Sequence, residues 1–172
     1  MRILAVSGSL RAASSNTALL KAAASLAPEG VAVTLFEGLD ALPHFNPDRE
    51  FEPNSAVGAW REALKACDAL LISSPEYAHG IPGVMKNALD WVVGSGELVD
   101  KRVGILDATA SPQGQSFAHD ALVEVLRVMS AKVIPDAVLH IPALRNKIGP
   151  DGSLADEGTK FALKLILKAL IA

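Results

Sequence analysis

Short apolar runs alternate along the chain with stretches in which apolar residues recur every three or four positions. Nearly continuous apolar runs are typical of strands that a parallel sheet buries on both faces. The recurring spacing is that of a helix with one apolar face. The runs predict strands at residues 3–6, 31–36, 69–73, 103–106 and 132–139. The periodic stretches predict helices around residues 19–27, 60–67, 84–92, 118–129 and 162–170.

This alternation of strands and helices favours parallel pairing through right-handed crossovers. We therefore expect an α/β fold: a flavodoxin-like three-layer sandwich with helices on both faces of a five-stranded parallel sheet of order 2-1-3-4-5. Residues 1–172 are expected to form a single domain. The longest irregular stretch, 38–54, contains three prolines, and a loop of that length is often functional.

Composition narrows the class of protein further. Of 172 residues, 50% are hydrophobic and 20% charged, which excludes a disordered chain. The formal net charge of −3 lacks the basic excess of a nucleic-acid-binding domain. The lone Cys67, on an apolar helical stripe, is expected to be a buried structural residue in a reducing compartment. With no targeting or membrane-spanning segment, we expect a soluble cytoplasmic protein that binds neither nucleic acid nor membranes.

In a sheet of this order, ligands bind at the carboxyl ends of strands one and three, where the strand order reverses. The loop after strand one, residues 7–17, combines six hydroxyl or amide side chains with Arg11 and then opens a helix. Free N–H groups at a helix start, hydroxyls and a guanidinium together favour an anion. The simpler alternative is helix capping by Ser14, Ser15 or Asn16, which accounts for only one of these residues.

Several other chemistries are disfavoured by missing patterns. Gly8 is followed neither by the lysine of a P-loop nor by the glycines of a dinucleotide fingerprint, which leaves a flavin monophosphate as a good candidate. The G-x-S-x-G elbow of hydrolases is also absent. The histidines, none paired at helical spacing, are expected to be surface or loop residues rather than zinc ligands: His44, His79, His119 and His140.

Two further loops follow strands three and four. Residues 73–83 carry Pro75 and Pro82, which fix backbone angles, and glycines that free others, so the segment can turn backbone groups toward a planar ligand. Its simpler reading is a strand-to-helix turn with Pro82 at the first helical position. Residues 107–116 are small and polar, and would form the far wall of the same crevice.

With these motifs in place, the sequence resembles the NADPH-dependent FMN reductase family, which includes quinone, chromate and azo-dye reductases. The resemblance rests on Gly8-Ser9-Leu10-Arg11 with Ser15-Asn16, and on Pro75-Glu76-Tyr77 leading into residues 82–91. It implies an FMN phosphate held by Ser9, Arg11, Ser15, Asn16 and Thr17. It implies a ribityl chain and ring lined by Pro75, Glu76, Tyr77, Ala78 and Gly80, and a far side closed by Ser111, Gln113 and Gly114. It also implies a homodimer or homotetramer through the helix Pro82–Val93.

The chain departs from the family pattern at Ala78, where asparagine is frequent, and at Gln115, where a second glycine is frequent. The family implies ping-pong chemistry, in which NADPH or NADH passes a hydride to FMN and a small-molecule acceptor then takes two electrons. This chemistry requires no catalytic side chain of the protein and no metal. The alternative is a flavodoxin-type electron carrier, which shares the fold and FMN but does not oxidise NAD(P)H by itself.

Overall fold

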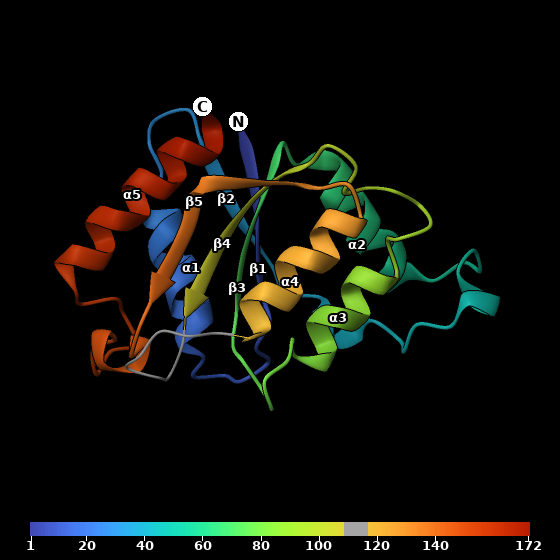
Figure 1. Cartoon of the computed structure of the whole chain (residues 1–172), viewed down its shortest axis with the longest axis horizontal. Helices are drawn as coiled ribbons and strands as arrows, with labels where there is room; N and C mark the ends of the chain where they lie inside the picture. The colour runs from blue at the N-terminus through green and yellow to red at the C-terminus, as the bar shows by residue number, and fades with distance from the viewer. Residues whose placement is uncertain (109–116) are drawn as a thin grey trace.

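The computed structural model describes residues 1–108 and 117–172. Five parallel strands form one sheet in the order β2-β1-β3-β4-β5, which confirms the predicted topology. The strands are β1 (Arg2–Ser7), β2 (Ala32–Phe36), β3 (Ala69–Ser74), β4 (Arg102–Ala108) and β5 (Lys132–Ile141). Their carboxyl ends share the lower edge of the sheet in Figure 1.

The α-helices cover both faces of this sheet. They are α1 (Ser15–Ser25), α2 (Ser55–Ala66), α3 (Gly83–Asp90), α4 (Phe117–Val128) and α5 (Glu157–Ile171). Figure 1 shows α1 and α5 on one side of the strands and α2, α3 and α4 on the other. Two buried apolar clusters match these two interfaces, one centred on Trp60 and Leu64 and the other on Leu19 and Leu163.

The uninterrupted apolar runs are explained by this double cover. In β3, Leu70 and Ile72 point into the cluster beneath α2 and α3, and Leu71 points into the cluster beneath α1 and α5. Alternate residues of a strand face opposite sides, so burial on both sides demands apolar residues at every position. Cys67, at the end of α2, is buried as expected, and burial raises the pKa of its thiol.

The segment predicted as a helix from Pro82 to Val93 is shorter than expected. The helix α3 begins at Gly83, after Pro82 in an extended N-cap conformation, and ends at Asp90. The apolar stripe that predicted this helix packs mostly inside the chain, with Ala88 and Val92 both fully inaccessible. An apolar periodicity alone cannot tell a core face from an interface, because both exclude water.

The irregular stretch 38–54 packs against α3. It contains two 3₁₀ turns, Leu39–Ala41 and Pro47–Arg49. The side chains of Asn87 and Trp91 both donate to the carbonyl of Pro43, at 3.0 and 2.7 Å, and Asn87 accepts from the N–H of Phe45. These bonds satisfy backbone groups that a loop would otherwise leave to water. Within the described residues, no helix has the length and apolarity needed to cross a bilayer.

Candidate active site

Two of the three loops singled out from the sequence meet where β1 and β3 lie side by side. Ser7 pairs with Ser73 at the end of the parallel register. The N–H of Gly8 then donates to the carbonyl of Ser73 at 2.9 Å, which extends the contact one residue into the loops. The predicted ligand edge is therefore a point of direct backbone contact between the loop 7–17 and the loop 74–82.

Gly8 is required at this contact for steric reasons. A Cβ atom added to Gly8 would lie 2.1 Å from Oγ and 2.8 Å from Cβ of Ser74. The nearest of these distances is far inside van der Waals contact, and the second involves an atom that a side-chain rotation cannot move. The glycine therefore allows the ends of the two strands to approach, which brings both loops to one crevice.

The loop 7–17 is held together by its own side chains. Thr17 Oγ1 donates to Ser7 Oγ at 2.9 Å, and Ser7 Oγ also lies 3.3 Å from the N–H of Ser9. Ser14 is the N-cap of α1, and its hydroxyl accepts from the N–H of Thr17. The capping alternative is therefore correct for Ser14. Capping does not account for the other hydroxyl side chains of the loop.

Asn16 ties this loop to the neighbouring strand. Its buried side chain accepts a hydrogen bond from the Ser73 hydroxyl through Oδ1, at 2.8 Å, across 57 residues of sequence. The bond uses the oxygen of the amide and leaves both hydrogens of its NH₂ group to donate elsewhere. Ser73 itself is fully buried at the end of β3. The interaction fixes the start of α1 relative to β3.

The donors that remain suit a phosphate. Among the described residues, the N–H groups of Ser15 and Asn16 in the first turn of α1 have no protein acceptor. Arg11 is exposed beside them, with no carboxylate partner in the described part of the chain. Thr17 differs, because its hydroxyl hydrogen is already donated to Ser7. The loop therefore offers backbone, amide and guanidinium donors around one point at a helix N-terminus.

The loop after β3 is shaped by a tight hairpin that the sequence did not reveal. Tyr77 and Gly80 exchange two backbone hydrogen bonds, N–H to carbonyl, at 3.1 and 3.0 Å. The two central residues, Ala78 and His79, have φ of 50° and 60°. Positive φ at both central positions defines a type I′ turn, which favours asparagine and glycine. The glycines of this loop were expected to supply such angles, but neither Gly80 nor Gly83 has a positive φ.

This turn gives a physical meaning to the departure noted at Ala78. Alanine pays a steric penalty in the left-handed region, whereas asparagine is tolerated there. The chain keeps the turn with two unfavoured residues in succession, so neighbouring contacts must stabilise it. Backbone strain of this kind, about 1–3 kcal/mol per residue, concentrates at ligand-binding loops.

Glu76 supplies one of those neighbouring contacts. Its Oε2 accepts from the N–H of Ala118 at 2.9 Å, in the first turn of α4, and its Oε1 lies 3.2 Å from Nδ1 of His79. The N–H of Ala118, followed by the hydrogen bond from His79, lowers the pKa of the Glu76 carboxyl. A negative charge at a helix N-terminus is favourable. Glu76 therefore links the turn to α4, and its expected place along the cofactor stays a prediction.

The third predicted wall falls outside the described residues. Ser111, Gln113 and Gly114 lie between 108 and 117, and their predicted roles remain predictions. Next to the end of β4 at Ala108 lies Asp107, which is 5% exposed and contacts His140 on β5.

A polar cluster that sequence reasoning missed surrounds Asp107. Nδ1 of His140, on β5, lies 2.8 Å from Oδ2 of Asp107, and the rings of His140 and His119 are 4.9 Å apart. His119 lies on α4, where burial lowers its pKa. His140 is exposed, as expected for a surface residue, whereas His119 is half-buried on α4. Asp107 and His140 are far apart in the sequence. They become neighbours because β4 and β5 pair in a register that places one opposite the other.

The comparisons with known proteins agree with this geometry. A profile of the NADPH-dependent FMN reductase family matches residues 1–144. The chain is 33% identical over 175 residues to an NAD(P)H-dependent FMN reductase of Pseudomonas aeruginosa, covering 99% of this chain and 93% of that protein. It is 33% identical over 178 residues to an NADPH:quinone oxidoreductase of Arabidopsis thaliana, covering 100% and 91%.

A solved structure extends the similarity to three dimensions. FerB, a flavoenzyme NAD(P)H:(acceptor) oxidoreductase from Paracoccus denitrificans, superposes with a TM-score of 0.80 at 27% identity, over 99% of this chain and 94% of that one. These findings confirm the expected family, enzyme class and cofactors, FMN and NAD(P)H. The chain belongs to the NADPH-dependent FMN reductase family.

Proposed function

We propose that the chain catalyses the reduction of quinones, azo compounds, chromate or similar small acceptors by NAD(P)H, in a ping-pong cycle through bound FMN. The observation that carries the proposal is the contact at Gly8, where the phosphate-type loop and the hairpin loop meet at one edge of the sheet. When bound, FMN accepts a hydride from NAD(P)H and passes two electrons to the acceptor.

In this proposal the first loop holds the phosphate of FMN. Arg11 supplies a charge-assisted fork, and Ser9, Ser15 and the NH₂ group of Asn16 supply neutral donors. Thr17, whose hydroxyl donates to Ser7, keeps the loop in shape. Because Ser9 and Asn16 are already buried in the described fold, the loop needs little rearrangement to receive an anion.

The hairpin loop holds the rest of the cofactor. Pro75, Ala78 and Gly80 would line it mainly with backbone, Glu76 fixes the loop to α4, and Tyr77 lies beside it. Tyr77 is 52% exposed, which leaves an aromatic edge available to a planar acceptor. Ser111, Gln113 and Gly114 would close the opposite side. No nucleophile or general base is required of the protein, because the cofactor carries the electrons.

Steady-state kinetics tests the proposal. The purified protein with FMN, and no partner protein, should oxidise NADPH when a quinone is added. Initial rates measured at several concentrations of both substrates should give parallel double-reciprocal lines, as a ping-pong cycle requires. Intersecting lines would refute that cycle. Absence of NADPH and NADH oxidation, with FMN bound, would favour the electron-carrier alternative.

We also propose a cytoplasmic homodimer or homotetramer formed through the segment Pro82–Val93. The resemblance to the family supports this assembly, and the lone Cys67 suits a reducing compartment. The buried stripe of α3 does not contribute, so contacts would use the solvent side, where Lys86 pairs with Asp90 at 2.5 Å. Sedimentation velocity of the purified protein decides the matter, since a single monomeric species would exclude the assembly.

A further inference from the structure

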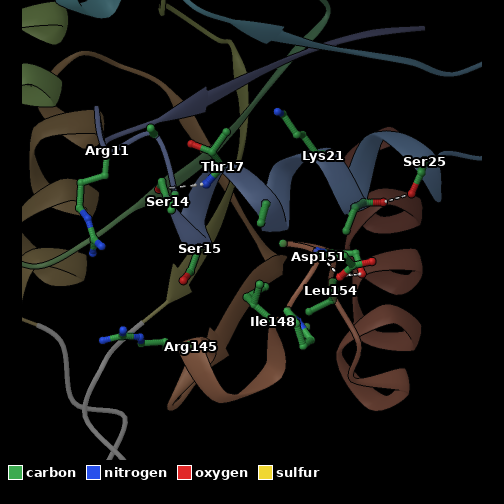
Figure 2. Close-up of a pocket in the computed structure, with 18 of the residues that line it drawn as sticks. Arg11, Ser14, Ser15, Thr17, Lys21, Ser25, Arg145, Ile148, Asp151 and Leu154 are labelled. Carbon is green, nitrogen blue, oxygen red and sulfur yellow. Dashed lines mark hydrogen bonds between the residues drawn. The ribbon is translucent and has the colours of Figure 1, made fainter.

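A cleft of about 890 Å³ begins at the first loop and runs along α1. One wall is the end of the first loop, from Arg11, and the outer face of α1 up to Leu26, and the other is the segment from Arg145 to Leu154 (Figure 2). The volume lies within the range of small-molecule sites. The second wall lies beyond residues 1–144, which match the family profile, so this cleft is built partly from a region outside that match.

The second wall is a structured turn. Ile148 and Leu154 form an antiparallel bridge, and the N–H of Gly149 donates to the carbonyl of Ser153 at 2.8 Å. Gly152 has a φ of +79°, which a glycine adopts without strain. Leu154 is buried against α5. The wall is therefore in place before a ligand arrives, which lowers the entropic cost of binding.

The end of the cleft nearest the first loop is cationic. In Figure 2, the side chains of Arg11 and Arg145 extend from opposite walls toward this end, and the side chain of Ser15 points the same way. In the described part of the chain neither arginine has a carboxylate partner, whereas Lys160, also at the cleft, pairs with Glu157 at 2.7 Å. Two unpaired guanidinium groups facing one space favour a phosphate between them.

Apolar side chains line the middle of the cleft. Ala18, Ala22 and Leu26 recur every four residues along α1, so they form one ridge on its surface. Ile148 and Pro150 lie on the opposite wall. Small side chains facing a proline and an isoleucine leave a slot for a flat ring, and burial of such a ring supplies apolar contact area.

The far end carries a carboxylate. Asp151 Oδ1 accepts from the N–H and the hydroxyl of Ser153, at 3.0 and 2.8 Å. The N–H of Ser153 lowers the pKa of Asp151, so the side chain is anionic at neutral pH. Its second oxygen remains available to accept from an amino group on a ring that lies in the apolar middle. A phosphate at one end, a flat ring beyond it and an amino group at the far end follow the order of groups in a 5′-adenosine phosphate.

We propose that this cleft binds the adenosine phosphate half of a dinucleotide whose other half lies at the flavin site. The inference rests on the proposed function, because Arg11 and Ser15 belong to the loop that would hold the FMN phosphate. A ligand reaching from that loop into the cleft must continue past a phosphate. The adenosine phosphate belongs to NADPH, the hydride donor, or to FAD bound in place of FMN.

Direct binding of small probes tests the site separately from activity. Adenosine 2′,5′-bisphosphate and 5′-AMP are titrated by calorimetry into the protein saturated with FMN. We expect at least one probe to bind the unaltered protein, and Arg145→Ala to weaken that binding about tenfold or more, as expected for loss of a charge-assisted pair. Lys168→Ala, on the exposed side of α5, is the matched control and should leave binding unchanged. Failure of both probes to bind would overturn the proposal.

A second set of measurements identifies the source of the adenosine phosphate. If it is NADPH, Arg145→Ala raises the KM for NADPH about tenfold and raises the KM for NADH similarly, because the two donors share the phosphates that join their halves, and it leaves FAD binding unchanged. If it is FAD, the same variant weakens FAD binding and leaves FMN binding unchanged. Ala22→Leu, which fills the slot without removing a charge, should reproduce the loss of probe binding in either case.

Two outcomes separate this inference from the proposed function. Loss of FMN affinity in Arg145→Ala as large as in Arg11→Ala would overturn the inference, because Arg145 would then belong to the flavin phosphate site. Failure of the unaltered protein to bind FMN would refute the proposed function, and the calorimetric titration of the probes, repeated without FMN, would still decide whether the cleft binds adenosine phosphates.

Discussion

The two described loops of the candidate site lie at the same edge of the sheet, but they are held by different means. The loop 7–17 is fixed by side-chain hydrogen bonds among Ser7, Ser14 and Thr17, and by Asn16 to β3. The loop 74–82 is fixed by a backbone turn with two residues of positive φ, and by one carboxylate bond to α4. The first loop is held mainly by side-chain hydrogen bonds, whereas the second is held by its backbone turn and one side-chain contact to a neighbouring helix.

This difference matches the tasks assigned to the loops. A phosphate needs several donors in fixed positions, and polar side chains that hold each other provide them. A flat ring with an accessible face needs a shaped backbone and few side chains in the way. We therefore expect changes in the first loop to act on cofactor affinity, and changes in the second to act on loop stability and acceptor use.

The largest effect is expected where the two loops touch. Gly8→Ala should destabilise the fold by about 1–3 kcal/mol, as overpacking does, and should abolish detectable FMN binding, because the added Cβ separates β1 from β3 at Ser74. The double variant Gly8→Ala/Ser74→Gly removes the clashing atoms and should recover much of both losses. Chemical denaturation and FMN fluorescence quenching measure the two quantities.

Gly58→Ala is the matched control for that experiment. Gly58 lies in the exposed part of α2, with no atom within 4 Å of an added Cβ. Alanine there should stabilise the chain by about 0.5–1 kcal/mol through helix propensity and leave FMN affinity unchanged. If Gly8→Ala behaves like Gly58→Ala, the close approach of the loops does not organise the site.

The next effect concerns the first loop alone. Arg11→Ala should weaken FMN binding about tenfold to a hundredfold, the cost of losing hydrogen bonds to a charged group, without changing the free energy of unfolding of the FMN-free protein. Lys164→Ala removes one positive charge from exposed α5 and controls for net charge. Titrations followed by flavin fluorescence give both dissociation constants, and equal constants would exclude Arg11 from the phosphate site.

A smaller effect is expected from the bond that supports the second loop. Glu76→Gln should lower the free energy of unfolding at pH 7, because the ionised carboxylate is favoured by the N–H of Ala118. The folded-state pKa is below the ordinary value of 4.5, so the contribution is fully present above pH 4.5 and is lost as pH falls through the folded pKa. The difference between the two proteins should therefore shrink in acid.

Urea denaturation from pH 7 to pH 3 measures that difference. Glu29→Gln, in the exposed connection after α1, is the control for charge removal. A difference that stays constant over this range would contradict the role assigned to the Glu76 carboxylate. FMN affinity should change only a few-fold, since Glu76 supports the loop from behind.

The smallest effect tests the strain in the turn. Ala78→Asn should raise the free energy of unfolding by less than about 1 kcal/mol, because asparagine is better tolerated at a φ of 50°. Ala143→Asn, at the same φ before the turn at Leu144, should stabilise by a similar amount without altering acceptor kinetics. Ala78→Asn should change the KM for quinone. If neither the free energy of unfolding nor the KM for quinone changes, the turn at Ala78 is not strained and does not affect acceptor use.

The sequence predicts the sheet well because strands buried on both faces have little choice of residue. Each of the five predicted strands overlaps an observed one, and their order is the common flavodoxin-like order that was expected. The first loop could be predicted for a related reason. Its donors are side chains adjacent in sequence, so their chemistry is visible before the fold is known.

The features that escaped prediction depend on geometry between distant residues. The type I′ turn places positive φ on Ala78 and His79, and the preference of such turns for asparagine and glycine does not predict this pair. The pairing of His140 with Asp107 arises from strand register, and the wall at Ile148–Leu154 from a short antiparallel bridge. The helix α3 ends at Asp90, although apolar periodicity continues to Val92. The spacing of apolar residues therefore does not predict the residue at which a helix ends.

The most direct test of the proposed function is an absorbance experiment without oxygen. The protein is loaded with FMN, freed of excess cofactor, and its visible spectrum is recorded before and after stoichiometric NADPH, and again after a quinone. We predict that the flavin bands bleach with NADPH and return with quinone. Bands that respond to neither NADPH nor NADH, or a protein that retains no FMN, would contradict the assignment of this chain as an NAD(P)H-dependent flavin reductase.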